Sequence, residues 1–234
     1  MTNLSPIVHV VDDDLSFRSA IGDLLDACGY RVALYKSALQ LLESSLGGEP
    51  ACILLDVKMR GMSGTRLQGR LAELGCRLPI IFLTGYGDIA TSVQAIKAGA
   101  EDFLTKPVQK EKLLAAIKRA LVHCDRMREQ ESGIATLRSL VSLLTPREYE
   151  VFAVLVQGRP HKQIAYILGT SERTVKLHRH NIMQKCRVQS LAQLAVIAER
   201  LGLFSAVGSG GNVNFQDAKL ATATTFGLTS AQGP

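Results

Sequence analysis

Several apolar runs in this 234-residue chain are followed directly by a carboxylate, a hydroxyl or an ammonium group. The residues that carry these groups are, in chain order, Asp12, Asp13, Asp14, Asp56, Thr84 and Lys106. If folding gathers the carboxylates, they repel one another, which raises their pKa values unless a cation lies between them. Magnesium is the hard cation that suits such incomplete oxygen cages. A carboxylate cluster with a metal ion and a nearby ammonium group is suited to phosphoryl transfer.

The roles in this chemistry can be assigned to individual residues. Asp56 stands alone after its apolar run and is the candidate nucleophile, which would form an aspartyl phosphate. Lys106 supplies positive charge to the phosphoryl oxygens, and Thr84 supplies a hydroxyl donor. Asp14 has a simpler alternative role, because an aspartate before a helical pattern can cap that helix. The order and strand-end positions of the whole set favour the phosphoryl site.

Alternating strand and helix patterns indicate how these residues are positioned. The runs typical of strands cover 7–11, 31–35, 51–55, 79–83 and 102–104. Helical patterns cover 17–28, 37–45, 88–98 and the residues from 110 onward. Strands joined by helical crossovers run parallel, so we expect an α/β doubly wound (βα)5 sheet of order 2-1-3-4-5. The carboxyl ends of strands one, three, four and five then meet at one shallow pocket.

About residues 5–125 resemble a two-component receiver domain. Four stretches carry the resemblance, namely 9–14, 54–59, 83–87 and 99–107. It implies a sensor histidine kinase that donates a phosphoryl group to Asp56, and a switch in which Thr84 moves toward that group while Phe103 rotates inward. It also implies a Mg²⁺ site. The ligands would be the side chains of Asp13 and Asp56 and the backbone carbonyl of Lys58, with Asp12 contributing directly or through water.

One position departs from the receiver pattern. Proline usually stands four residues after the phosphorylated aspartate, and here that residue is Arg60. Arginine lacks the fixed φ of proline and adds a cation beside the site. We therefore expect a looser loop after Asp56, with consequences for phosphorylation kinetics and for the geometry of the metal site.

Positive charge is concentrated in the second half of the chain. Residues 1–130 hold 16 Lys/Arg and 15 Asp/Glu, whereas residues 141–204 hold 9 Lys/Arg and 4 Asp/Glu. A compact basic segment suggests a polyanionic partner, although a solvated basic surface would have the same composition. The patterns in 145–203 are all helical.

A helix-turn-helix is predicted within this basic segment. A first helix opens with Thr145 as its cap, Pro146 at its first position and Glu148 three residues after the cap. A short helix over 162–168, a turn at Gly169 and a helix from Ser171 to about residue 185 follow. The last helix leaves a polar face exposed. We expect it to enter the major groove of double-stranded DNA, with its N-terminal half at the base edges.

The DNA contacts divide by position on these helices. Arg173, Lys176 and His180 lie on the exposed face. We expect Lys176 and His180 to hydrogen-bond bases, and Leu177 beside them to touch a thymine methyl. Residues better placed for phosphates are Lys162, Thr174, Arg179 and Lys185. The alternative is a helical module that binds protein and carries a solvated basic face.

About residues 143–203 resemble the LuxR-type DNA-binding domain. The matching stretches are 144–148, 162–165, 171–178 and 181–185, with small departures at His161 and Cys186. Together with the receiver, this makes the chain similar to the NarL/FixJ subfamily of response regulators. We expect a receiver domain over 1–125, a helical linker over 126–142, a helix-turn-helix domain over 143–204 and a flexible low-complexity tail over 205–234. The linker pattern fits either a dimer seam or an ordinary helix that covers the sheet.

The remaining features indicate a cytoplasmic protein that does not bind a membrane. No apolar run is long enough to cross a bilayer, and residues 1–6 lack the features of a secretion signal. The five cysteines are scattered without a Cys-x-x-Cys pair, which favours a reducing compartment.

The leading interpretation is a phosphorylation-dependent transcription regulator and not an enzyme. Phosphorylation would favour homodimerisation through about residues 88–120, and RNA polymerase is a further candidate partner. Two alternatives stay open. One is a Mg²⁺-dependent hydrolase, although its usual second acid two residues beyond the nucleophile is missing after Asp56. The other is a constitutive DNA-binding protein with a vestigial receiver.

Overall fold

The computed structural model describes residues 5–47, 49–85 and 96–203 of the chain. Two compact units divide the chain, Met1–Glu129 and Gln130–Pro234. Most of the helix predicted over 88–98 lies outside the described residues, as does the tail predicted over 205–234. Among the helices that are described, none has the length and apolar composition needed to cross a lipid bilayer.

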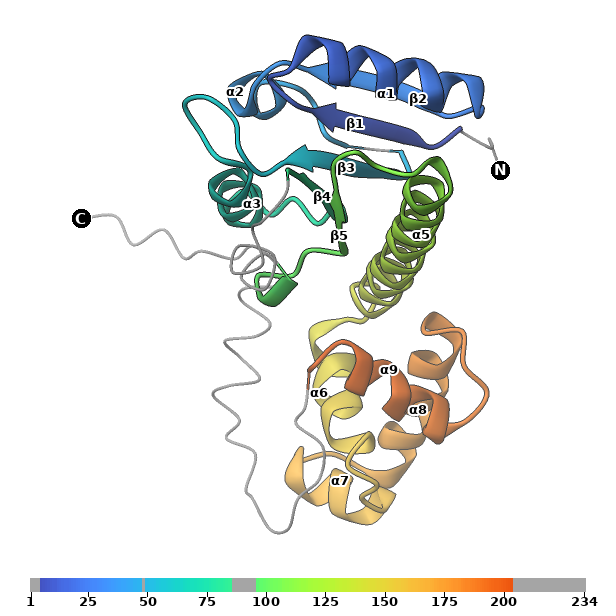
Figure 1. Cartoon of the computed structure of the whole chain (residues 1–234). Coiled ribbons are helices and arrows are strands. Elements are labelled where there is room, and N and C mark those ends of the chain that lie inside the picture. Colours follow the sequence, from blue (N-terminus) through green and yellow to red (C-terminus); the bar gives the residue numbers. More distant parts are fainter. Residues whose placement is uncertain (1–4, 48, 86–95, 204–234) are drawn as a thin grey trace, which may run out of the picture. The chain divides into compact units, whose positions relative to one another are not determined.

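The first unit is built on the predicted doubly wound sheet. Five parallel strands lie in the order β2-β1-β3-β4-β5 (Figure 1), which confirms the expected fold class. Their bounds are β1 Ile7–Val11, β2 Arg31–Tyr35, β3 Ala51–Asp56, β4 Ile80–Thr84 and β5 Asp102–Thr105. All strands of a parallel sheet point the same way, so the residues that follow β1, β3, β4 and β5 emerge at one edge.

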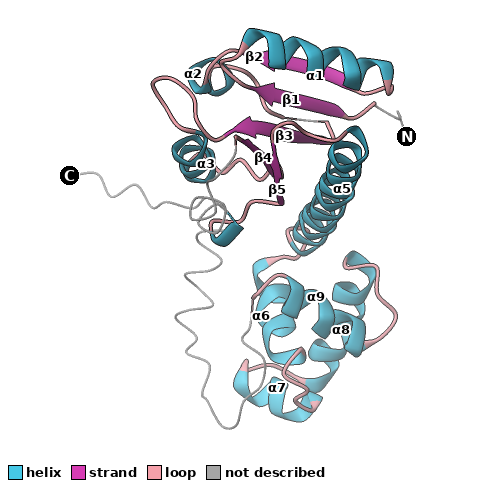
Figure 2. Ribbon diagram, in the orientation of Figure 1, coloured by secondary structure: helices cyan, strands magenta, loops and turns pink. Residues whose placement is uncertain are grey.

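Helices cover both faces of this sheet (Figure 2), because the inner strands are apolar on both sides. Their bounds are α1 Leu15–Ala27, α2 Ala38–Leu42, α3 Gly64–Glu73 and α5 Lys110–Val141. On one face Val8, Val10 and Leu54 pack with residues of α1 and α5. On the other face Val11 and Leu55 pack with residues of α2 and α3. These two apolar clusters fix the helices to the sheet and so position the strand ends that carry the polar residues.

Two helices differ from their predicted extents. The helix predicted over 37–45 ends at Leu42, and the Ser44 amide bonds to the carbonyl of Leu41, three residues back, in a tightened last turn. The last helix of the first unit continues as α5 through Gly133 to Val141 and so includes most of the predicted linker. The boundaries predicted at 125, 142 and 204 remain predictions.

The second unit consists of helices over its described residues, as expected. They are α6 Pro146–Leu155, α7 His161–Ile167, α8 Glu172–Lys185 and α9 Leu191–Arg200. Val151, Phe152, Ile164, Val175 and Ile182 are fully buried in their shared core. The ends of α6, α7 and α8 agree with the predicted helix-turn-helix to within a few residues.

Local sequence explains where these helices begin and turn. The Thr145 hydroxyl accepts from the Glu148 amide, and the Glu148 carboxylate accepts from the Thr145 amide, so the expected capping box is formed. The Ser171 hydroxyl accepts from the Thr174 amide at 3.1 Å and caps α8. Gly169, in the turn between α7 and α8, has φ of +60°, where a side chain would be strained.

Candidate functional sites

Three aspartates meet at the carboxyl ends of β1 and β3. Ligand oxygens of Asp12, Asp13 and Asp56 all lie within 4.8 Å of one another. Asp12 and Asp56 are buried, whereas Asp13 is exposed. The short turn after β1 places Asp12 and Asp13 beside the last residue of the neighbouring strand β3. The sheet therefore brings together the three carboxylates that the sequence predicts as magnesium ligands.

Lys106, the residue directly after β5, reaches into this cluster. Its Nζ lies 2.6 Å from Asp12 Oδ2 and 2.9 Å from Asp56 Oδ1. Its side chain is only 21% exposed, so the ammonium group is largely shielded from water. The predicted convergence of Lys106 with the aspartates is thus present in the structure. One ammonium group balances only part of the charge of three carboxylates, which leaves the cluster suited to a cation.

The charges and the burial of the cluster shift two pKa values. Burial raises the pKa of Asp56, and the charges of Asp12 and Asp13 add to this, while Lys106 opposes it. Burial by itself would lower the pKa of Lys106, but hydrogen bonds and charges from Asp12 and Asp56 outweigh it and raise that pKa. Lys106 therefore remains an ammonium group at neutral pH. A cation near Asp56 would favour its ionised, nucleophilic form.

Asp14 caps a helix, which is the simpler of its two predicted roles. Its Oδ1 accepts from the amides of Ser16 and Phe17 at 2.8 and 3.2 Å, so Asp14 is the N-cap of α1. The three consecutive aspartates thus have two different structural roles. Asp12 and Asp13 join the cluster, and Asp14 starts the helix behind it.

The two predicted switch residues lie on adjacent strands. Thr84 ends β4 and is buried, and its hydroxyl donates to the Gly85 carbonyl at 3.1 Å. Phe103 on β5 is half-buried, with its ring centroid 6.1 Å from that of Phe82. Packing against Phe82 is a purely structural role for Phe103, and it is compatible with a role in the switch. Movement of either residue stays a prediction.

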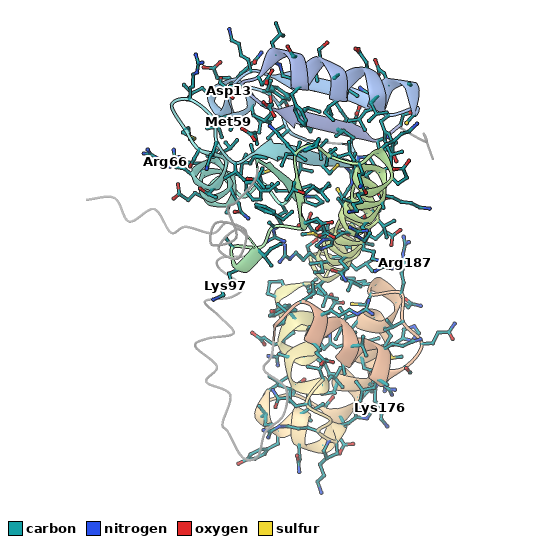
Figure 3. The ribbon with its side chains drawn as sticks, in the orientation of Figure 1. Asp13, Met59, Arg66, Lys97, Lys176 and Arg187 are labelled. Atoms are coloured by element: carbon teal, nitrogen blue, oxygen red, sulfur yellow. The ribbon has the colours of Figure 1, made fainter. Side chains whose placement is uncertain are left out.

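An open cleft of about 490 Å³ adjoins the cluster and is lined by Asp13 and by the loop after β3. Figure 3 shows Asp13 and Met59, which both line it, at this edge of the sheet. Lys58 also lines the cleft, but its role as a carbonyl ligand remains a prediction. The Arg60 amide donates to Asp13 Oδ2 at 3.1 Å, and the Arg60 guanidinium Nε lies 3.9 Å from the same oxygen. Proline, usual at this position, has no amide hydrogen to donate.

Gly64 allows α3 to start directly against the end of β3. A Cβ on Gly64 would lie 2.3 Å from the Asp56 carbonyl oxygen, a distance that real atoms do not tolerate. The Gly64 amide donates to the Val57 carbonyl at 3.0 Å, which fixes the loop that lines the cleft. Sequence reasoning missed this residue, because a close backbone approach leaves no periodic signal.

We expect Gly64→Ala to lower the free energy of unfolding by about 1–3 kcal/mol, the usual cost of forcing an extra methyl group into a packed site. Urea denaturation of the full chain measures this. Gly69→Ala is the matched control in the same helix, since a Cβ there meets no described atom within 4 Å. The control should be neutral or stabilising by up to about 1 kcal/mol. Equal destabilisation by both variants would show that the close approach of Gly64 to the Asp56 carbonyl is not the cause.

The second candidate site is the outer face of α8. Arg173, Lys176 and His180 are exposed there, and Leu177 is 59% exposed. Figure 3 shows Lys176 on the outer side of the helix. Val175 and Ile182 on the opposite side are buried against the core. The residues predicted to contact bases, Lys176, Leu177 and His180, thus share one solvent-facing surface with Arg173.

The residues predicted at phosphates have more varied environments. Lys162 is exposed, whereas Thr174, Arg179 and Lys185 are partly buried. Arg179 Nε is a buried donor that bonds to no described atom. Lys185 Nζ donates to the buried Glu148 Oε2 at 2.6 Å, so its ammonium already ties α8 to α6. Phosphate contacts by these four residues stay predictions, and Lys185 has an additional structural role that the sequence did not indicate.

Each of the two units matches a known protein family. Residues 8–118 match the response regulator receiver domain, and residues 142–198 match the luxR family of bacterial regulatory proteins. The response regulator protein TmoT of Ectopseudomonas mendocina is 42% identical over 201 residues, which cover 86% of this chain and 91% of TmoT. The transcriptional regulatory protein FixJ of Azorhizobium caulinodans is 36% identical, over 84% of this chain and 93% of FixJ. The solved structure of the response regulator StyR is 42% identical, with a TM-score of 0.75 over 84% of this chain and 99% of StyR.

A receiver joined to a LuxR-type helix-turn-helix domain defines a class, the two-component transcriptional regulators. Members of this class bind DNA and are not conventional enzymes, and they are paired with sensor kinases. This chain belongs to the NarL/FixJ subfamily of response regulators.

Proposed function

We propose that Asp56 accepts a phosphoryl group from the phosphohistidine of a sensor kinase. A carboxylate oxygen of Asp56 attacks phosphorus, so that a P–O bond forms while the P–N bond to the donor imidazole breaks. The imidazole leaves with the electron pair of that bond and takes up a proton. The product is a mixed anhydride on Asp56. Burial of Asp56 beside the Lys106 ammonium, 2.9 Å away, supports this role.

The residues around Asp56 fit a magnesium ion. The side chains of Asp12, Asp13 and Asp56 and the carbonyl of Lys58 would hold it, since hard oxygen ligands are those that Mg²⁺ prefers. When bound, the ion neutralises charge on the phosphoryl oxygens. Lys106 supplies a second positive charge, and Thr84 offers its hydroxyl as a donor once the phosphoryl group is present.

Phosphorylation then controls DNA binding through assembly. Movement of Thr84 and Phe103 favours a receiver conformation that dimerises through about residues 88–120. Two α8 helices bind paired half-sites in the major groove, and the summed contacts raise affinity. RNA polymerase is the further partner through which a bound dimer affects transcription. The regulator works in the cytoplasm, where its DNA lies.

The observation that carries the proposal is the placement of Lys106 between two of three clustered aspartates. Intact-mass measurement of the full chain with acetyl phosphate and Mg²⁺ tests it. We expect the mass of one phosphoryl group to be added, mapped to Asp56 after borohydride reduction, and no addition when EDTA removes the metal. Addition that survives EDTA, or that maps elsewhere, would overturn the assignment.

Arg60 should weaken magnesium binding, because its guanidinium lies beside Asp13 and repels the cation. We expect Arg60→Gln to raise Mg²⁺ affinity about two- to fivefold at low ionic strength, with a smaller gain at higher salt. Isothermal titration calorimetry measures this directly. Arg66→Gln is the control, since Arg66 is exposed but is not among the described residues that line the cleft. An equal gain in both variants would show a general charge effect instead.

Lys176 should read a base. We expect Lys176→Ala to cost about 1–3 kcal/mol of binding free energy and to relax preference at one base position of the selected operator. Lys162→Ala serves as the comparison, because a lost phosphate contact weakens binding to all sequences and lowers the salt dependence. Fluorescence anisotropy with single-base operator variants separates the two patterns. A uniform loss for Lys176→Ala would make Lys176 a phosphate contact.

A further inference from the structure

The Lys106 ammonium group has a third neighbour besides the two aspartates. Its Nζ lies 4.2 Å from the centroid of the Phe17 ring. An ammonium group this close to an aromatic face is attracted by the ring quadrupole, and the attraction grows when water is excluded. The Lys106 side chain is 21% exposed, and Phe17 is partly buried, so the contact is partly shielded.

Phe17 is held in place by its backbone, by the residue that follows it and by the apolar cluster beneath it. Its amide donates to Asp14 Oδ1 at 3.2 Å in the N-cap of α1. The next residue, Arg18, donates through its guanidinium to the Asp12 carbonyl at 2.6 Å, which ties the helix to the end of β1. The Phe17 ring also packs against the apolar cluster beneath α1 and α5. The first turn of α1 therefore fixes the ring beside the cluster.

We propose that Phe17 is a positioning residue that keeps the Lys106 ammonium aimed at the phosphoryl oxygens of Asp56. Lysine is a point charge on a flexible four-carbon stem, so its direction depends on its surroundings. Phosphorylation converts the Asp56 carboxylate into an anhydride and moves its charge outward onto the phosphoryl group. The contact of Lys106 with Asp56 Oδ1 must then change, whereas the contact with the Phe17 ring persists. The ring, together with Asp12 at 2.6 Å, supplies support for Lys106 that does not depend on the state of Asp56.

This inference rests on the proposed function, and its test has to separate an electrostatic role from simple packing. Site-specific replacement of Phe17 by mono-, di- and trifluorophenylalanine keeps the shape of the ring while weakening its negative face. Each full-length variant is phosphorylated with acetyl phosphate at saturating Mg²⁺, and the rate constant is measured. Mg²⁺ affinity and denaturant stability are measured on the same samples. Phe17→Leu, which keeps apolar bulk without a ring, and Phe17→Tyr, which keeps the ring, complete the series.

We expect the logarithm of the phosphorylation rate constant to fall in steps with the number of fluorines, by about three- to tenfold in total. Mg²⁺ affinity and stability should stay constant across the fluorinated series. Phe17→Leu should be at least as slow as the trifluoro variant, and Phe17→Tyr should retain the wild-type rate.

A rate constant that stays flat across the fluorinated series would overturn the proposal, even if Phe17→Leu is slow, because packing would then suffice. A fall in Mg²⁺ affinity or stability that parallels the fall in rate would also overturn it. If wild-type protein takes up no phosphoryl group, or if Asp56→Asn takes it up equally, the proposed function itself fails. Failure of the proposed function is distinguishable from failure of this inference, because it appears in wild-type protein and in Asp56→Asn, both of which keep Phe17.

Discussion

Asp56→Asn should leave the full-length protein unable to take up a phosphoryl group from acetyl phosphate or from a kinase. A neutral amide cannot form the acyl phosphate, so the loss should be complete and not a matter of degree. The substitution is nearly isosteric at a buried site, and the fold should persist with Lys106 still paired to Asp12. Intact-mass measurement reports phosphorylation, and light scattering reports the dimerisation that we expect to be lost with it.

Asp14→Asn is the matched control for this experiment. It removes one carboxylate from the same acidic triplet, but Asp14 acts as the cap of α1, and asparagine caps helices about as well. Phosphorylation and dimerisation should therefore be close to wild type. Phosphorylation of Asp56→Asn at the wild-type rate would show that another residue is the acceptor. Unchanged dimerisation would show that Asp56 does not control assembly.

The largest effect on stability should come from Lys185→Met in the second unit. Glu148 is buried, and Lys185 is the cation that pairs with it at 2.6 Å. Removal of Lys185 leaves a buried carboxylate without its cation, which typically costs 3–5 kcal/mol. Because the Lys185 side chain is 33% exposed, we expect a smaller loss of about 2–4 kcal/mol. Hydrogen exchange of the α6 and α8 amides in the full chain measures it.

The double variant Glu148→Gln/Lys185→Met is the control, because it removes the stranded charge together with its partner. It should be clearly more stable than Lys185→Met alone. If the two are equally destabilised, the loss comes from packing of the lysine stem and not from the unpaired carboxylate.

The same ion pair predicts a pH dependence. Burial alone would raise the pKa of Glu148, but hydrogen bonds from Lys185 and Thr145 outweigh it and lower the pKa from its ordinary 4.5. A carboxyl whose pKa is lower in the folded state stabilises that state above its ordinary pKa. This stability is lost as pH falls through the lowered value. Wild-type protein should therefore lose more second-unit stability below about pH 4.5 than Glu148→Gln does.

Much of the first site follows from sequence because parallel strands end at one edge. Once the alternation of strands and helices is recognised, Asp12, Asp56, Thr84 and Lys106 must emerge together. The α8 face is predictable for a similar reason, since helical spacing separates Lys176 and its neighbours from the buried positions.

The contacts that the sequence did not indicate depend on side-chain direction and close approach. No pattern connects Phe17 with Lys106, because their meeting requires the rotamers of both side chains. Lys185 lies on a polar stretch of α8, and its partner Glu148 is on another helix. Helical spacing alone therefore indicated only a phosphate contact for Lys185. Gly64 resembles any loop glycine until the Asp56 carbonyl is placed above it.

We propose that the acidic site of the receiver controls DNA binding by the helix-turn-helix. The most direct test is the affinity of full-length protein for its selected operator at one fixed salt concentration, with and without beryllofluoride and Mg²⁺. We expect affinity to rise by about tenfold or more with beryllofluoride, since a dimer engages two half-sites at once, and to stay at the basal value in Asp56→Asn. Equal affinity with and without beryllofluoride would contradict the account and would favour a constitutive DNA-binding protein with a vestigial receiver.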